Sequence, residues 1–139
     1  MVENDFPIGA PLLNISALED QTMTSSELCL DQVKFIFETQ TLTVKVVAET
    51  DEIELIQTET VPMLEMAPPE WGRSLIGKKL QTFWQCENAQ GYQDQIIFAF
   101  GTLQPSVTFL AEGSVLKVFQ SRPLSKEQLL STPRQQIVR

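Results

Sequence analysis

The chain has 139 residues, of which 42% are hydrophobic and 20% charged, and its net charge is −8. This length and composition are typical of one ordinary globular domain, and they exclude a disordered or fibrous protein. No apolar run is long enough to cross a bilayer, and the acidic N-terminus lacks a secretory pattern. We therefore expect a single domain over residues 1–139, soluble and cytoplasmic, with no membrane partner.

The charge is divided unevenly along the chain. Residues 1–59 contain twelve acidic and two basic residues, a balance of −10, whereas residues 60–139 contain six acidic and eight basic residues, a balance of +2. Binding to nucleic acid depends on a clustered basic surface that releases counterions. The sequence shows no such cluster, so we expect no nucleic-acid partner.

Alternating apolar residues predict the first strands. The alternation runs through residues 33–37, 42–48 and 53–56, with short polar turns between the runs. Runs of this length with a period of two are typical of an antiparallel meander. The polar stretch 22–27 predicts one more turn before them.

The second half of the chain repeats the first. Residues 31–57 return as residues 94–120 without a gap, and nine of the 27 aligned pairs are identical, where average amino-acid usage gives about one or two. The identical pairs are Asp31/Asp94, Gln32/Gln95, Phe35/Phe98, Phe37/Phe100, Thr39/Thr102, Val44/Val107, Ala48/Ala111, Glu49/Glu112 and Gln57/Gln120. We interpret this as an internal duplication, 9–57 and 72–120. The alternative is that strand alternation alone makes two sheets alike.

Two segments lie outside the repeats. Residues 58–71 contain three prolines, which lack the amide that a central strand donates, so they form a connector. In the tail 121–139, Ser125 and Gln128 have capping-box spacing, and nearby leucines predict a short C-terminal helix that ends at Pro133.

These patterns together predict the fold class. We expect a mainly β protein of two duplicated four-stranded antiparallel units, forming a barrel or a two-layer sandwich, with the short C-terminal helix. Two copies are too few for a solenoid. The halves are expected to be related by a pseudo-twofold axis, like the subunits of a homodimer.

One predicted sheet face is apolar where solvent would be expected. Ile97, Ala99, Leu110, Val115 and Phe119 occupy positions that point away from the core, with Lys117 as the main charge. Sheets apolar on both faces are covered on both faces. The cover is the other copy, the C-terminal segment or a partner chain. The aromatic residues of the second half, Trp84 among them, are expected to fill the core or an interface.

This apolar face favours a non-catalytic protein-interaction or self-associating domain, with Ile97, Leu110 and Phe119 as its surface and a protein partner or a second copy as its ligand. The alternative is a small-ligand-binding β-barrel, because eight strands can enclose one small molecule. Bulky inward phenylalanines such as Phe35 and Phe98 argue against a ligand in the interior.

The sequence offers little for catalysis. It contains no histidine, the commonest general base and metal ligand, and no phosphate-loop or nucleophile motif. We therefore expect no enzyme activity, no cofactor and no metal. If Asp31 and Asp94 met on the axis they would share one proton; the alternative is that each bonds local backbone amides.

Two further features leave alternatives open. The acidic turn at residues 49–52 is either a calcium site or a solvated hairpin tip, and the second copy has only one acid at 112–115, which favours a tip. Cys29 and Cys86 form no metal-type pair and are expected to be buried thiols. Their spacing leaves a disulfide possible, although this would be unusual in a cytosol.

A set of residues in the second half carries a family resemblance. The set is Gly77-Lys78-Lys79-Leu80, Trp84, Asn88, Gln90-Gly91-Tyr92, Asp94 and Phe98-x-Phe100. It resembles the signature of a small bacterial domain family of unassigned function, over about thirty residues. The resemblance implies no catalytic residue, cofactor or substrate.

Overall fold

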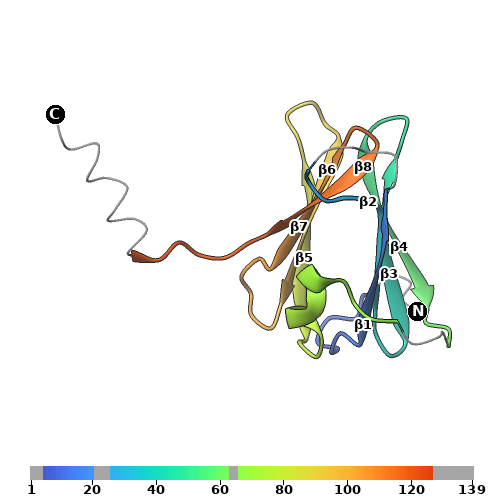
Figure 1. The fold of residues 1–139 in the computed structure, drawn as a ribbon, viewed down its shortest axis with the longest axis vertical. Helices are drawn as coiled ribbons and strands as arrows, with labels where there is room; N and C mark the ends of the chain where they lie inside the picture. The colour runs from blue at the N-terminus through green and yellow to red at the C-terminus, as the bar shows by residue number, and fades with distance from the viewer. Residues whose placement is uncertain (1–4, 21–25, 63–65, 127–139) are drawn as a thin grey trace.

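The structure, a computed structural model, describes residues 5–20, 26–62 and 66–126 (Figure 1). Within these residues, eight strands and one 3-10 helix follow in order. They are β1 (Asn14–Glu19), β2 (Cys29–Ile36), β3 (Gln40–Val47), β4 (Glu52–Glu59), η1 (Glu70–Leu75), β5 (Leu80–Glu87), β6 (Gln93–Phe100), β7 (Val107–Glu112) and β8 (Val115–Gln120). The predicted mainly β class is confirmed.

The strands form one antiparallel sheet that folds over into a half-barrel. Its order is β4-β3-β2-β8-β7-β6-β5, and β1 pairs with β2 outside this path. The two halves join where Cys29 and Leu30 of β2 pair with Lys117 and Leu116 of β8. Figure 1 shows the result as two layers, β1–β4 and β5–β8. Because β4 and β5 end the order without pairing to each other, the sheet does not close into a full barrel.

The core between the layers is aromatic. The ring centroid of Phe35 on β2 lies 4.8 Å from that of Phe98, 5.5 Å from that of Phe100 and 5.8 Å from that of Phe109. All four side chains are buried, and the inward alternation predicted along residues 33–37 is confirmed. One continuous core therefore joins the two layers.

The two layers have the same strand order. Each is a four-stranded meander, and Phe35 and Phe98 lie in the second strand of their own layer. Asp51 and Ser114, 63 positions apart, both have a left-handed backbone, with φ of 55° and 70°. Upstream the match weakens, because Gly9 lies in a turn at φ 89° whereas Gly72 lies in η1. These observations support the internal duplication, which stays a prediction.

Helical structure is found where the sequence did not predict it. The helix expected near the C-terminus falls mainly on residues 127–139, which lie outside the described residues, as does most of the turn expected at 22–27. Instead η1 follows Pro69, at the end of the predicted connector. Its Trp71 packs edge-on against Phe109, with ring centroids 5.9 Å apart. A tertiary contact of this kind leaves no local pattern in the sequence.

The tips of two hairpins are tied together by Asp51. Its carboxylate accepts hydrogen bonds from the backbone N–H of Gly113 at 3.1 Å and of Ser114 at 2.8 Å. We expect Asp51→Ala to lower the free energy of unfolding by about 2 kcal/mol, because it removes two charge-assisted bonds and disfavours the left-handed backbone.

Asp51→Asn is the matched control, since asparagine tolerates the same φ and keeps one acceptor oxygen. Urea unfolding monitored by circular dichroism measures both variants. We expect a loss of about 1 kcal/mol or less for the asparagine variant. Equal stability of the alanine variant and the parent would show that these bonds contribute nothing.

Candidate binding surface

The outer face of the layer β5–β8 carries a row of side chains that crosses all four strands. Trp84 on β5 pairs with Ile97 on β6, Ile97 with Thr108 on β7, and Thr108 with Phe119 on β8. Directly paired residues of an antiparallel sheet share a face. This outer row is 40% exposed at Trp84 and 46% exposed at Phe119, while Ile97 is half-buried.

Leu110 lies in the neighbouring row of the same face. It pairs with Gln95 on β6 and with Lys117 on β8, and it is half-buried. The structure therefore brings the three predicted surface residues, Ile97, Leu110 and Phe119, onto one face. Sequence reasoning did not assign Trp84 to this face. Strict alternation along β5 would put Trp84 on the side of the buried Leu80, but the irregularity between Leu80 and Thr82 shifts the register, and Phe83 faces inward against Phe98.

The positive charge of Lys117, at the margin of this face, is paired with two carboxylates. Its ammonium lies 2.8 Å from a carboxylate oxygen of Glu27 and 3.0 Å from one of Glu112. The hydrogen bonds to Glu27 and Glu112 raise the pKa of Lys117 above its ordinary value. The face therefore presents an apolar row beside a compensated cation.

The structure bears on two of the three candidate covers of this face, the other repeat and the C-terminal segment. The layer β1–β4 packs against the inner side of β5–β8, and the described segment after β8 leads away from the body (Figure 1). Residues 121–123 lie over the middle of the outer row, where with Ile97 and Thr108 they line a pocket of about 400 Å³, and Thr108 is buried. Within the described residues, neither of these two candidates covers Phe119.

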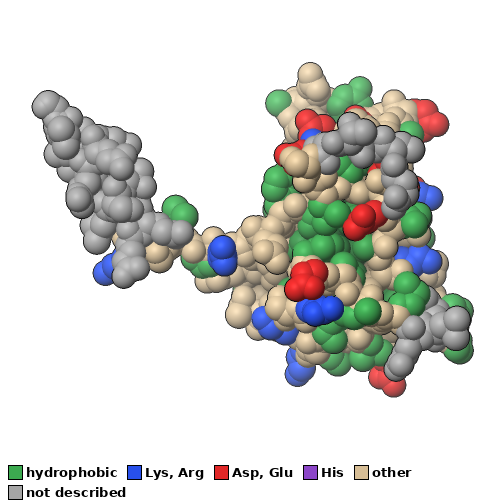
Figure 2. Space-filling view, in the orientation of Figure 1, with side chains coloured by type: hydrophobic (Ala, Val, Ile, Leu, Met, Phe, Trp, Pro, Cys, Tyr) green, Lys and Arg blue, Asp and Glu red, His purple; other side chains and the backbone are tan. Residues whose placement is uncertain are grey.

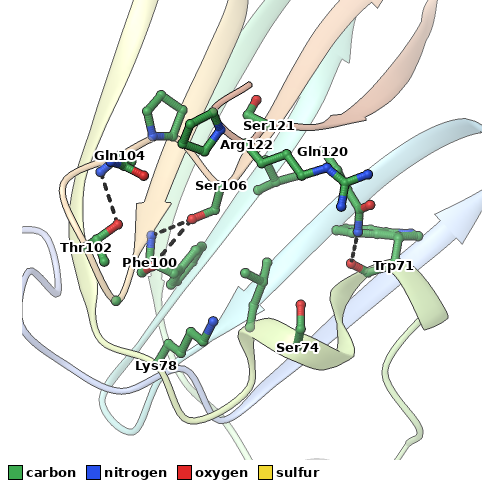
Figure 3. Close-up of a pocket in the computed structure, with 15 residues that line it drawn as sticks. Trp71, Ser74, Lys78, Phe100, Thr102, Gln104, Ser106, Gln120, Ser121 and Arg122 are labelled. Carbon is green, nitrogen blue, oxygen red and sulfur yellow. Dashed lines mark hydrogen bonds between the residues drawn. The ribbon is translucent and has the colours of Figure 1, made fainter. Parts of the chain in front are cut away.

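A separate, larger pocket of about 480 Å³ opens beside η1 (Figure 3). Trp71, Ser74 and Leu75 form one wall, the loop between β6 and β7 forms another, and residues 120–123 complete it. The walls are joined by a hydrogen bond of 3.2 Å from the Gln120 side-chain amide to the backbone carbonyl of Trp71.

The hydrophobic surface is not confined to the sheet face. Figure 2 shows hydrophobic side chains gathered in the middle of the view, between the two layers of Figure 1. A pocket of about 420 Å³ lined by Ala17, Leu28, Met66 and Trp71 lies between β1 and η1. Basic side chains in Figure 2 lie at the lower left of the body, at its right edge and along the segment that leaves it.

The carboxylates singled out from the repeat have different partners. Asp94 accepts a hydrogen bond of 3.1 Å from the Asn88 side-chain amide, which fits local bonding. Asp31 instead interacts with Asp20. The structure thus links Asp31 with a carboxylate of its own layer, and the hypothesis of an Asp31–Asp94 dyad has no support in it.

The acidic turn and the two cysteines have structural surroundings. Asp51 binds the opposite hairpin as described above, and Glu52 accepts a hydrogen bond of 3.2 Å from the backbone N–H of Gln93. These contacts favour a hairpin tip over a calcium site, and the described residues contain no group of three or more acids or cysteines that could hold a metal. Both cysteines are free; Cys29 is buried and Cys86 half-buried.

The Asp20–Asp31 pair makes stability depend on pH. The hydrogen bond with Asp20, then desolvation and like-charge repulsion, raise the pKa of Asp31 above its ordinary 3.8. A carboxyl group whose pKa is raised on folding stabilises the protein most below about pH 3.8, and this contribution is lost as pH rises through the folded-state pKa. The free energy of unfolding of Asp31→Asn, relative to that of the parent, should therefore increase as the pH rises from about 4 to about 7.

Urea unfolding of both proteins at the two pH values measures this gain. Asp94→Asn serves as the control, because Asp94 has a neutral partner. A stability difference between Asp31→Asn and its parent that is the same at both pH values would contradict the coupling of the two carboxyl groups.

The fold defines the class of this protein as a small antiparallel β half-barrel built of two meanders. The chain belongs to a family of unknown function (DUF6334), whose model matches residues 1–125. This confirms the expected membership of an uncharacterised domain family. No curated protein and no solved structure matches the chain. In the described part of the chain, no helix has the length and apolar character needed to span a membrane.

Proposed function

We propose that this domain is a non-catalytic interaction module that binds a second copy of itself through the outer face of β5–β8. The observation that carries the proposal is the outer row, in which Trp84 and Phe119 are 40% and 46% exposed on either side of Ile97. Large aromatic side chains on a rigid surface supply much of the energy of protein interfaces.

The distribution of charge favours a second copy as the partner. The whole chain carries −8, but residues 60–139, which contain β5–β8, have six acidic and eight basic residues and a balance of +2. Contact through this layer joins the two weakly charged halves and keeps the two acidic halves apart. Electrostatic repulsion between copies is then smallest in this arrangement.

The proposal includes no catalytic step, cofactor, nucleic acid or membrane, and it keeps the cytoplasmic location expected from the sequence. We propose a non-catalytic role because the chain has no histidine and because Asp94 and Asp51 make structural hydrogen bonds. The internal duplication is part of the same proposal. The inner faces of the two β units pack against each other, and the outer face of β5–β8 is then free to bind a partner.

Sedimentation equilibrium tests the association. We expect the parent to self-associate as its concentration rises, and Phe119→Asp to stay monomeric, because a charge buried in the interface would have no partner. Leu18→Asp on β1 is the matched control, since Leu18 is 55% exposed on the other layer. It should associate like the parent.

A parent that stays monomeric at the highest soluble concentration would contradict self-association. An equal loss of association in Phe119→Asp and Leu18→Asp would also contradict it, because the effect would then come from added charge alone.

The alternative function, small-ligand binding, is favoured by the pocket beside η1. Buried apolar side chains, phenylalanine rings among them, fill the space between the layers. The pocket beside η1 lies at the margin of this core, where Phe100 and Val107 form part of its lining. A ligand would therefore bind at the end of the half-barrel and leave its interior packed.

A further inference from the structure

We propose that the pocket beside η1 binds a small organic phosphate with an apolar body. The pocket has a volume of about 480 Å³, within the range of about 300–1,000 Å³ that is usual for small-molecule sites. The inference goes beyond the self-association proposed above and does not depend on it, although it gives the ligand-binding alternative a chemical class.

The charge of the pocket is opposite to that of the protein. Fifteen residues line it; Lys78 and Arg122 are among them, and none of the fifteen is Asp or Glu. The chain as a whole has 18 acidic and 10 basic residues. A local balance of +2 in a protein of net charge −8 favours an anion at this place over the rest of the surface.

The two cations are available to a ligand. Among the described residues, the ion pairs join Arg73 to Glu70, and Lys117 to Glu27 and Glu112, so they do not engage Lys78 or Arg122. The methylene stem of Lys78 lies against Gly101, where an added Cβ would be 3.3 Å from Lys78 Cδ. This contact supports the stem, and the ammonium faces the pocket (Figure 3).

The opposite wall of the pocket is formed without the ligand. Ser106 Oγ accepts a hydrogen bond of 3.0 Å from the backbone N–H of Phe100, and Thr102 Oγ1 accepts one of 3.2 Å from the backbone N–H of Gln104. The first bond joins the two ends of the loop between β6 and β7, and the second lies within the loop. A preformed wall lowers the entropic cost of binding.

The donors around the pocket match a phosphate group. A phosphate presents three acceptor oxygens. Lys78 supplies an ammonium, Arg122 a guanidinium that can bind two oxygens at once, and Ser74 a hydroxyl that points into the pocket in Figure 3. Charge-assisted bonds of this kind are about twice as strong as neutral ones.

An apolar wall distinguishes an organic phosphate from free phosphate. The indole of Trp71 and the side chain of Leu75 line the pocket beside the donors. Trp71 is held in place, because its ring packs edge-on against Phe109 at 5.9 Å. A ligand with an aromatic or alkyl group next to its phosphate buries that group here and gains affinity from the apolar contact.

Fluorescence of Trp71 measures binding directly. The chain has two tryptophans, so Trp84→Phe leaves Trp71 as the reporter in the pocket. We expect benzyl phosphate to change its emission saturably and inorganic phosphate to bind more weakly. Benzyl alcohol, which lacks the charge, should give no saturable change in the same range.

Variants in the Trp84→Phe background assign the site. Lys78→Met and Arg122→Gln should each raise the Kd for benzyl phosphate by roughly tenfold or more, and Lys78→Arg should retain most of the affinity. Lys79→Met makes the same change of net charge one residue away, outside the pocket lining. It should bind like the background protein.

Two results would overturn the proposal. One is the absence of any saturable change of Trp71 emission with benzyl phosphate. The other is an equal weakening of binding by Lys78→Met and Lys79→Met, which would show a response to net charge alone. Neither result bears on self-association, because sedimentation of Phe119→Asp tests that surface separately.

Discussion

Replacing Phe35 with alanine is expected to lower the free energy of unfolding by about 3–5 kcal/mol. Phe35 is fully buried, and its ring contacts the rings of Phe98, Phe100 and Phe109, which belong to the opposite layer. The substitution leaves a cavity where the two meanders pack against each other. Because domains are stable by only about 5–15 kcal/mol, this loss is a large fraction of the total stability.

A double-mutant cycle isolates the contact between the layers. Phe35→Leu and Phe98→Leu keep most of the apolar volume, so each should cost less than its alanine counterpart. An aromatic pair adds about 0.5–1.5 kcal/mol beyond its buried area, so the two leucine substitutions should be non-additive by that amount. Urea unfolding provides all four values. Strict additivity would mean that the two rings do not stabilise each other.

Gly72→Ala is expected to have the next largest effect, a loss of about 1–3 kcal/mol from overpacking. A Cβ built on Gly72 would lie 2.5 Å from Cδ1 of Ile15. Ile15 is fully buried on β1, so its side chain has little freedom to move away. The close approach of η1 to β1 therefore requires glycine for space rather than for a left-handed backbone.

Removing the clashing methyl group should rescue this variant. Ile15→Val lacks Cδ1 and alone should cost about 0.5–1.5 kcal/mol. The double variant should be more stable than the sum of the two losses allows, and close to Ile15→Val alone. If the losses simply add in thermal and urea unfolding, the contact between Gly72 and Ile15 is not the cause.

Much of the sheet was predictable because strand alternation is a local signal. Residues 33–37 alternate in sequence, and their apolar members are buried in the structure. The same reasoning put Ile97, Leu110 and Phe119 on one outward face, where they lie. Trp84 belongs to that face too, but prediction of the register of β5 was needed to see it, and two irregularities interrupt the pairing of β5 with β6.

The features that the sequence did not predict depend on contacts between distant segments. The seam between the layers consists of two residue pairs, Cys29 with Lys117 and Leu30 with Leu116, and nothing local marks these residues as partners. The pocket likewise needs η1, Lys78 and Arg122 to meet. Lys78 was part of the family resemblance, yet no spacing along the chain relates it to Arg122.

The emission of Trp84 tests most directly whether the outer face of β5–β8 is a binding surface. In a Trp71→Phe variant Trp84 is the remaining tryptophan, and it is 40% exposed in the single chain. We expect the emission of Trp84 to shift to shorter wavelength as the protein concentration rises. Acrylamide should also quench this emission less, because the indole becomes covered. Emission and quenching that stay constant at every concentration would contradict self-association through this face.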